Sequence, residues 1–382
     1  MAEQLAGRGR SGVFSLFKIA GIRISLDYSW FIVFALVIWS LSAGYFPRNF
    51  PGQTTQTYWI AGLIATFLFF ASVLIHELSH SLMAMRSGIN IPEITLFLFG
   101  GVSKLSEEPR DPKTELKIAI VGPLSSFGLA LLFWAMQKLF SGPGVSLTKA
   151  VLHYLAWINL ALGIFNLIPG FPLDGGRILR ALRWWKTGSL TQATKLASDV
   201  GKGFAVALML LGGLQIFAGF LIGGLWLLFI GMFLRSVAEG GYQEVVVRQM
   251  LQGVQVDEVM VREVVSVAPD LPLNQLINGY FLHYGYKGFP VVQGGRVLGM
   301  VSVFNVKGLS EDEQKNKTVA QVMEPLSDDL LISPQVSLTE ALSKTGQTEA
   351  GRLVVMQGGK MIGLISKTGL LRYLEMKRIL EG

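Results

Sequence analysis

Two histidines and a glutamate stand close together in the segment His76-Glu77-Leu78-Ser79-His80. On a helix, residues four apart project from one face, so both imidazoles are placed to bind one metal ion, as zinc sites require. Glu77 lies on a neighbouring part of that surface, where its carboxylate can take a proton from a metal-activated water. The alternative is a pair of helix histidines satisfied by packing, but three ionisable groups in an apolar helix are costly without a partner. The segment therefore predicts one Zn²⁺ per chain, with His76 and His80 as ligands and Glu77 as general base.

A zinc site of this type needs a third protein ligand, and the chain offers few donors. It contains no cysteine and only four histidines, of which His153 lies at the far end of another apolar stretch and His283 in a polar region. Asp174 is the better candidate, within Asn166–Arg177 (NLIPGFPLDGGR). Two prolines in this string break a helix, so the carboxylate can point inward from a non-helical stretch. The alternative is that Asp174 caps the helix that follows, since Asp is a good N-cap.

Two asparagines, Asn159 and Asn166, stand seven residues apart on one face of an apolar stretch. Asn166 is eight residues before Asp174, and its amide is a candidate donor to a developing oxyanion. The alternative for both residues is hydrogen bonding between helices, which is common in membranes.

The composition favours a membrane protein, because 51% of the residues are hydrophobic and 15% are charged, against about 25% charged in soluble domains. Val13–Leu26 alternates apolar and polar residues, which predicts one or two short strands at the interface. Six later stretches are apolar and long enough to cross a bilayer. They are Ser29–Tyr45, Tyr58–Met83, Leu116–Phe140, Leu152–Ile168, Phe204–Leu221 and Ile222–Val237.

The segment Ile89–Leu105 (INIPEITLFLFGGVSKL) is unlike an ordinary loop. Its β-branched and aromatic residues, with Gly100-Gly101, predict a strand that enters the membrane edge and turns back. Such backbone is tolerated at depth only where protein or a water-filled cavity satisfies its polar groups. The alternative is a short amphipathic connector on the surface.

The positive charge lies in the apolar part of the chain. From Tyr242 onward there are 14 Lys and Arg against 15 Asp and Glu, whereas the preceding part has 19 against 11. Alternate connections between the spans carry most of these cations, so the positive-inside rule predicts a multi-pass cell-membrane protein with both termini in the cytoplasm. No basic tract is interleaved with aromatic residues, so nucleic acid is excluded as a partner and the lipid bilayer is expected.

After about residue 241 the sequence resembles a soluble domain that contains a repeat. Val256–Leu309 and Val319–Leu374 each have a Val-Met pair, a strand, a helix and a strand–Gly-Gly–strand unit. An internal repeat that fills a domain is typical of a pseudosymmetric α/β module. We therefore expect a transmembrane domain over residues 1–241 and a cytoplasmic domain over 242–382, with repeats at about 256–309 and 319–374.

Taken together, the H-E-x-x-H motif, the string Phe165–Arg177 and the strand-like insert resemble the site-2 protease family, peptidase type M50. The resemblance implies a polytopic α-helical membrane fold of about six helices with short membrane-associated strands. It implies regulated intramembrane proteolysis of a membrane-spanning protein, for example one like an anti-sigma factor. It also implies that the strand region around Gly100 and Gly101 receives unwound substrate by strand addition. One departure is Ser126, where the family often has Asn.

The C-terminal repeat looks like a pair of cystathionine-β-synthase (CBS) domains, which often bind adenine nucleotides and form homodimers. Where the family usually has a ribose-binding acidic residue, this sequence has Asn305 and Gly369, so a purely dimerising or docking role stays open. Two rival functions also remain, a CBS-regulated transporter and a zinc-binding scaffold without catalysis.

Overall fold

The computed structural model describes residues 13–98, 100–103, 109–139, 147–346 and 348–381. The chain divides into two compact units, Met1–Gln243 and Glu244–Gly382, and this boundary lies two residues beyond the one expected. Two expected bounds, the end of the insert at Leu105 and the end of the third span at Phe140, lie outside the described residues.

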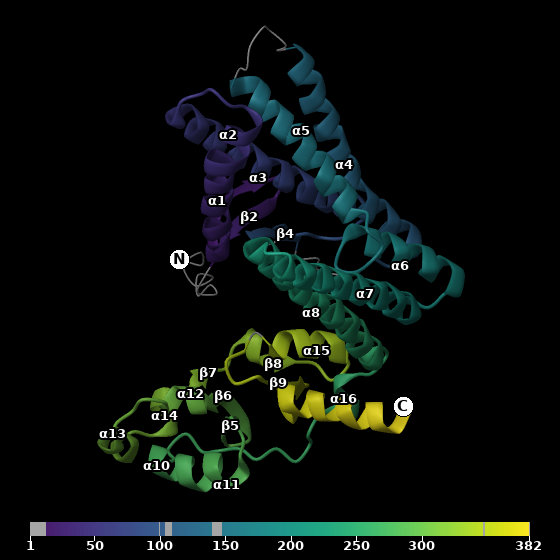
Figure 1. Cartoon of the computed structure of the whole chain (residues 1–382). Coiled ribbons are helices and arrows are strands. Elements are labelled where there is room, and N and C mark those ends of the chain that lie inside the picture. The colour runs from purple at the N-terminus through teal and green to yellow at the C-terminus, as the bar shows by residue number, and fades with distance from the viewer. Residues whose placement is uncertain (1–12, 99, 104–108, 140–146, 347, 382) are drawn as a thin grey trace. The chain divides into compact units, whose positions relative to one another are not determined.

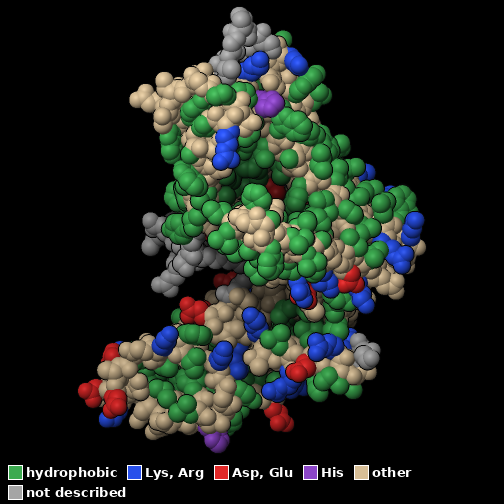
Figure 2. All heavy atoms as spheres, viewed as in Figure 1, with side chains coloured by type: hydrophobic (Ala, Val, Ile, Leu, Met, Phe, Trp, Pro, Cys, Tyr) green, Lys and Arg blue, Asp and Glu red, His purple; other side chains and the backbone are tan. Residues whose placement is uncertain are grey.

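Six helical segments among the described residues are long and apolar enough to cross a membrane, which confirms the predicted number of spans. They are Tyr28–Asn49 (α1, Tyr28–Ser40, a π-helical turn, Leu41–Tyr45, and α2, Phe46–Asn49), α3 (Thr55–Arg86), α4 (Pro112–Leu139), α5 (Leu147–Asn166), α7 (Leu190–Phe217) and α8 (Leu221–Leu251). Hydrophobic side chains cover most of the visible surface of this unit (Figure 2), as expected where lipid is the solvent.

The helices extend beyond the predicted spans at their polar ends. The fifth was expected from Phe204, but α7 begins at Leu190 behind Ser189, whose hydroxyl accepts a hydrogen bond from the Gln192 backbone N–H. The sixth was expected to end at Val237, but α8 continues to Leu251. Hydropathy detects only the apolar turns of a helix, whereas capping and propensity decide where the helix ends.

Both predicted strand regions form one four-stranded sheet in the order β1-β2-β3-β4. Its strands are β1 (Val13–Ile19), β2 (Ile22–Asp27), β3 (Glu93–Phe97) and β4 (Gly100–Ser103). The β1–β2 and β3–β4 pairs are antiparallel, whereas β2 and β3 are parallel. The insert is therefore a strand hairpin and not a surface connector, and β4 is an edge strand.

The sheet is anchored to the helices by one face. Ile22, Ile24 and Ile94 are fully buried and pack in one cluster with Val73 of α3 and Ile118 of α4. In Figure 1, β2 and β4 lie beside α1 and α3. This packing fixes the β3–β4 hairpin next to the part of α3 that carries the histidine motif.

A seventh helix of the unit, α6 (Asp174–Thr187), is short and amphipathic and precedes α7. The segment between α5 and α6 packs closely on α7, because a Cβ at Gly201 would collide with the carbonyl oxygen of Phe171. The first residue of α6, Asp174, is thereby held against the helices of the metal site.

The C-terminal unit contains two three-stranded sheets, β5-β6-β7 and β10-β9-β8. The strands are β5 (Gly288–Gln293), β6 (Arg296–Ser302), β7 (Glu324–Pro325), β8 (Leu331–Ile332), β9 (Arg352–Gln357) and β10 (Lys360–Ser366). The helices are α9 (Val256–Val259), α10 (Leu273–Gln275), α11 (Leu282–Tyr284), α12 (Val303–Val306), α13 (Glu311–Asn316), α14 (Val319–Val322), α15 (Leu338–Thr345) and α16 (Lys367–Glu381).

The two repeats exchange short pieces of strand. Glu324 and Pro325, which precede the strands of the second repeat, pair with Met300 and Gly299 of the first. In return Val261, near the start of the first repeat, exchanges two backbone hydrogen bonds of 2.9 Å with Leu364 of β10. Each sheet is thus completed by the other repeat.

Candidate metal centre

The helix α3 carries His76, Glu77 and His80 in its C-terminal half. A 32-residue helix with Thr54 as its N-cap forms here, since the stretch is mostly apolar and lacks proline. His76 and His80 are 4% and 6% exposed, and their spacing of four puts both rings on the same face. The predicted juxtaposition of the two imidazoles is therefore present.

Three donor atoms meet at one point, the Nε2 atoms of His76 and His80 and Oδ2 of Asp174. Asp174 Oδ2 lies 3.1 Å from each Nε2 atom, and the two Nε2 atoms are 3.2 Å apart. Donors at about 2.0 Å from a tetrahedral ion are roughly 3.3 Å from one another. The separations and the His₂Asp donor set thus fit zinc, with the fourth position left to a small molecule.

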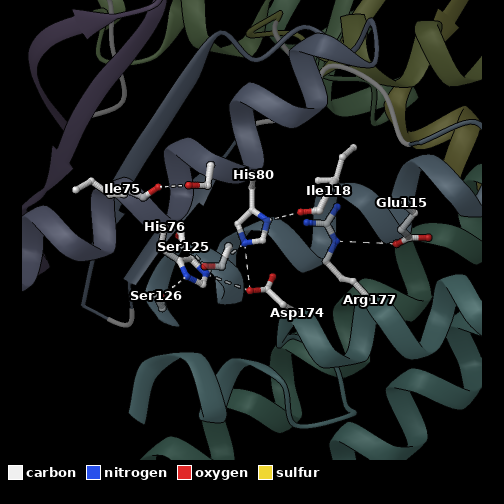
Figure 3. A network of polar contacts seen from close by, with 11 residues as sticks. Ile75, His76, His80, Glu115, Ile118, Ser125, Ser126, Asp174 and Arg177 are labelled. Atoms are coloured by element: carbon white, nitrogen blue, oxygen red, sulfur yellow. Dashed lines mark hydrogen bonds and ion pairs between the residues drawn. The ribbon is translucent and has the colours of Figure 1, made fainter. Parts of the chain in front are cut away.

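The outer nitrogen of each imidazole is held by a residue of α4 (Figure 3). His80 Nδ1 lies 2.7 Å from the carbonyl oxygen of Ile118, so Nδ1 donates to it, and in the neutral ring Nε2 is then the atom whose lone pair can bind a metal. His76 Nδ1 lies 2.9 Å from the hydroxyl of Ser126. Partners of this kind fix the tautomer and the ring orientation of metal-binding histidines.

Gly122 of α4 makes the space for the rings. A Cβ at this position would collide with Nε2 of His80 and lie 2.8 Å from Nε2 of His76. The atoms it would meet are the two metal-facing nitrogens, so any side chain here would occupy the metal position itself.

The sequence predicted that Asp174 lies in a non-helical stretch, but Asp174 is the first residue of α6. The N-cap is Leu173, with extended backbone, and no side chain caps this helix, so the alternative role of Asp174 as cap is wrong. Burial raises the pKa of Asp174, but the two histidines beside it outweigh this effect and lower the pKa below its usual value. This favours the carboxylate, which is the form that binds metals.

The three donors open into a cavity of about 610 Å³. Glu77 lines it, together with the predicted residues Asn166, Gly100 and Gly101, and the remaining walls are mainly apolar side chains of α3, α5 and α8. A Cβ at Gly101 would collide with Cγ of Glu77 and lie 2.8 Å from its Cδ, so the edge strand β4 passes directly against this side chain. All the residues predicted for the site thus reach a single cavity.

Two other polar residues considered in the sequence lie elsewhere. Asn159 is fully buried, and its amide donates to the Ser72 hydroxyl of α3 and to the Leu155 carbonyl, so the helix-to-helix alternative is right for it. His153 does not line the metal cavity; its Nδ1 atom lies 3.3 Å from the amide nitrogen of Gln137.

Three site residues were not singled out by their sequence: Gly122, Ser126 as a histidine partner, and Glu115. Glu115 is fully buried on α4 and accepts from the Nε of Arg180 on α6 at 2.6 Å, and Arg177 Nε lies 4.0 Å from the same oxygen. The sequence did offer a signal for Glu115, since it is an acidic residue near the start of an apolar helix. An ionisable group inside a membrane domain is costly and therefore marks a candidate site.

Comparison with known proteins gives a consistent assignment. The model of Peptidase family M50 matches residues 64–153 and 144–210, and the CBS domain model matches residues 256–310. The chain is 33% identical to zinc metalloprotease MJ0392 of Methanocaldococcus jannaschii, over 96% of this chain and 97% of that protein. It is 31% identical to the Rip3 protein of Mycobacterium tuberculosis, over 95% of this chain and 93% of that protein.

Among solved structures, the site-2 protease from Methanocaldococcus jannaschii matches with 34% identity and a TM-score of 0.42. It covers 60% of this chain and 95% of that one.

Proposed function

This chain is a multi-pass membrane metalloprotease of peptidase family M50, the site-2 proteases, and from that premise we propose that it hydrolyses a peptide bond within or near a membrane-spanning segment of another protein. The observation that carries the proposal is the meeting of His76, His80, Asp174 and Glu77 at one apolar-walled cavity. A charged cluster of this kind is costly inside a membrane domain unless a metal and a substrate use it.

In this proposal His76, His80 and Asp174 hold the zinc ion that the family implies. When bound, zinc acts as a Lewis acid that makes water a nucleophile near neutral pH and polarises the scissile carbonyl. The Ile118 carbonyl accepts from Nδ1 of His80, which leaves Nε2 of the neutral ring available, and Ser126 holds the orientation of the His76 ring.

Glu77 is proposed as general base and then general acid. Its carboxylate accepts the proton of the attacking water and passes it to the leaving amine nitrogen. The half-buried Asn166, at the end of α5 and on the cavity wall, is proposed to donate its amide hydrogen to the oxygen of the tetrahedral intermediate.

The edge strand β4 is proposed to bind the substrate. A helical substrate keeps its peptide groups inside its own hydrogen bonds, whereas an extended one can pair with a sheet edge. Gly101 of β4 lies against Glu77, so a strand added to this edge is brought beside the proposed base. The partner is thus an unwound transmembrane segment, and an anti-sigma-factor-like protein is one example of the class.

The CBS pair is proposed to dimerise or dock and not to sense adenine nucleotides. Asn305 stands where the family usually has an acidic ribose-binding residue. Its side-chain oxygen accepts from the Ser302 backbone N–H at 2.7 Å and from the Ser302 hydroxyl at 2.8 Å. Calorimetry of the full chain with ATP, ADP and AMP is expected to give no binding heat, and saturable heat with any of them would support nucleotide sensing instead.

The function is tested by comparing Glu77→Gln with the parent chain in metal analysis and in cleavage of a membrane-spanning substrate. We expect one zinc per chain in both proteins and product only with the parent. Bound zinc with no Glu77-dependent product would indicate the zinc scaffold. The transporter would be indicated by a different result: no cleavage product, and a solute flux into proteoliposomes that is the same for the parent and for Glu77→Gln.

A further inference from the structure

A second cavity lies on the outside of the helix pair α4–α5 and shares no lining residue with the metal cavity. Its volume is about 570 Å³. From α4 it is lined by Phe127, Ala130, Leu131, Trp134, Gln137 and Lys138, and from α5 by His153, Ala156, Trp157 and Leu160. No step of the proposed hydrolysis uses this groove.

The groove changes from polar to apolar along its length. Lys138, Gln137 and His153 lie at the end where α4 finishes and α5 begins, whereas Phe127 and Leu160 lie deepest along the two helices. From Phe127 to Lys138 the helix advances roughly 17 Å at 1.5 Å per residue. That length is close to half of the roughly 30 Å hydrocarbon core, which is the depth of one leaflet.

The polar end is built from interacting side chains. The Lys138 ammonium lies over the Trp134 ring, 5.5 Å from its centroid. The Gln137 amide nitrogen is 3.3 Å from Nδ1 of His153, so the amide donates to it. Trp134, one turn before Lys138, is more than half exposed, as tryptophans are near the level of lipid headgroups.

The charge at this end is of one sign. Residues 28–76 and 116–173, which include α5 and all of α4 after its first turn, contain no Asp or Glu. Among the described residues that line the groove, Lys138 and His153 are the ionisable ones, and none is a carboxylate. Figure 2 shows Lys, Arg and His side chains at this end of the unit. A basic end above an apolar groove favours an anionic, amphiphilic ligand.

We propose that the groove binds one phospholipid with an anionic headgroup. Its phosphate lies against Lys138 and His153, and one acyl chain follows α4 past Leu131 to Phe127. A free phosphate or a sugar phosphate satisfies only the polar end, and a zwitterionic lipid leaves the positive charge uncompensated, so both bind more weakly.

The headgroup contact is tested on the purified full chain by native mass spectrometry with added phosphatidylglycerol or phosphatidylcholine. The parent is expected to retain phosphatidylglycerol preferentially, and Lys138→Gln to reduce its occupancy about fivefold. Lys149→Gln removes the same charge near the start of α5, outside the groove, and is expected to leave occupancy unchanged. Equal losses in the two variants, or equal retention of the two lipids, would overturn the proposal.

The acyl-chain contact is tested with a second matched pair. Leu131 and Leu132 are both exposed on α4, but only Leu131 lines the groove. Leu131→Trp is expected to displace the bound lipid, whereas Leu132→Trp is not. If glycerol phosphate competes as well as the intact lipid, the groove is a phosphate site. If Leu131→Trp alters the oligomeric state and leaves lipid retention unchanged, it is a protein interface. Either result sinks the lipid assignment.

Discussion

Glu115 of α4 and Arg180 of α6 form a buried ion pair that joins the two helices on either side of the metal centre. One turn after Glu115, the Ile118 carbonyl accepts from His80. Two turns before Arg180, α6 begins with Asp174. The pair therefore fixes the distance between a histidine orienter and the proposed third ligand, although neither member touches the donor atoms.

Arg180→Gln is expected to destabilise the protein by about 3 kcal/mol, because it leaves the buried Glu115 carboxylate with only its longer contact to Arg177. It should also weaken zinc binding, since α6 is no longer held against α4. Zinc affinity is measured by chelator competition below the unfolding temperature, which separates metal binding from folding. Arg183→Gln, on the exposed face of the same helix, is the control and should change neither property. Parental zinc affinity in folded Arg180→Gln would show that the pair has no positioning role.

Ser126→Ala is expected to weaken zinc binding by about 10- to 100-fold, because it removes the partner of His76 Nδ1. Ser125→Ala is a matched control one residue away, since the Ser125 hydroxyl donates to the Gly122 carbonyl and not to a histidine. Ser126→Asn keeps a hydrogen-bonding group and should retain most of the affinity. Equal behaviour of the two alanine variants in the chelator assay would refute the role of Ser126.

Gly122→Ala is expected to abolish zinc binding, because the new methyl group takes the space between the two Nε2 atoms. Gly128→Ala provides the comparison on the same helix: nothing lies within 4 Å of its added Cβ, and alanine in a helix interior is favoured over glycine by about 1 kcal/mol. Metal content after purification decides the matter, with full zinc in Gly128→Ala and none in Gly122→Ala.

The orientation of the chain can be read from single cysteines, because the natural sequence has none to remove. Gln53→Cys lies between α2 and α3, Gln192→Cys at the start of α7 and Lys360→Cys in the CBS pair. The positive-inside rule predicts that a membrane-impermeant maleimide labels only Gln53→Cys in intact cells. Labelling of Lys360→Cys without permeabilisation would reverse the assignment.

The sequence predicts those parts of the site that are local. One helix contains both His76 and His80 and the apolar residues around them. The prolines before Asp174 predict the end of another helix. The six spans follow from length and hydropathy alone. Such features depend on residues that are close in sequence, so a sequence pattern is sufficient to predict them.

The contacts between helices cannot be predicted from patterns along the sequence. Gly122 and Ser126 lie about 40 to 50 residues after the histidines they contact, and their role depends on how α4 is rotated against α3. Ser126 was noted only as a departure from a family pattern. The placement of Asp174 within the first turn of α6, and not before it, depends on how the preceding segment packs on α7. Helix boundaries are the least certain part of any prediction from pattern.

The exchange of strand pieces in the C-terminal unit has a consequence for cooperativity. Since Glu324–Pro325 completes the sheet of one repeat and Val261 extends the sheet of the other, deleting either repeat leaves its neighbour with a missing strand. The two halves should therefore melt in a single transition. A partner that loosens one half would weaken the other at the same moment, which gives the pair the behaviour of one two-state switch.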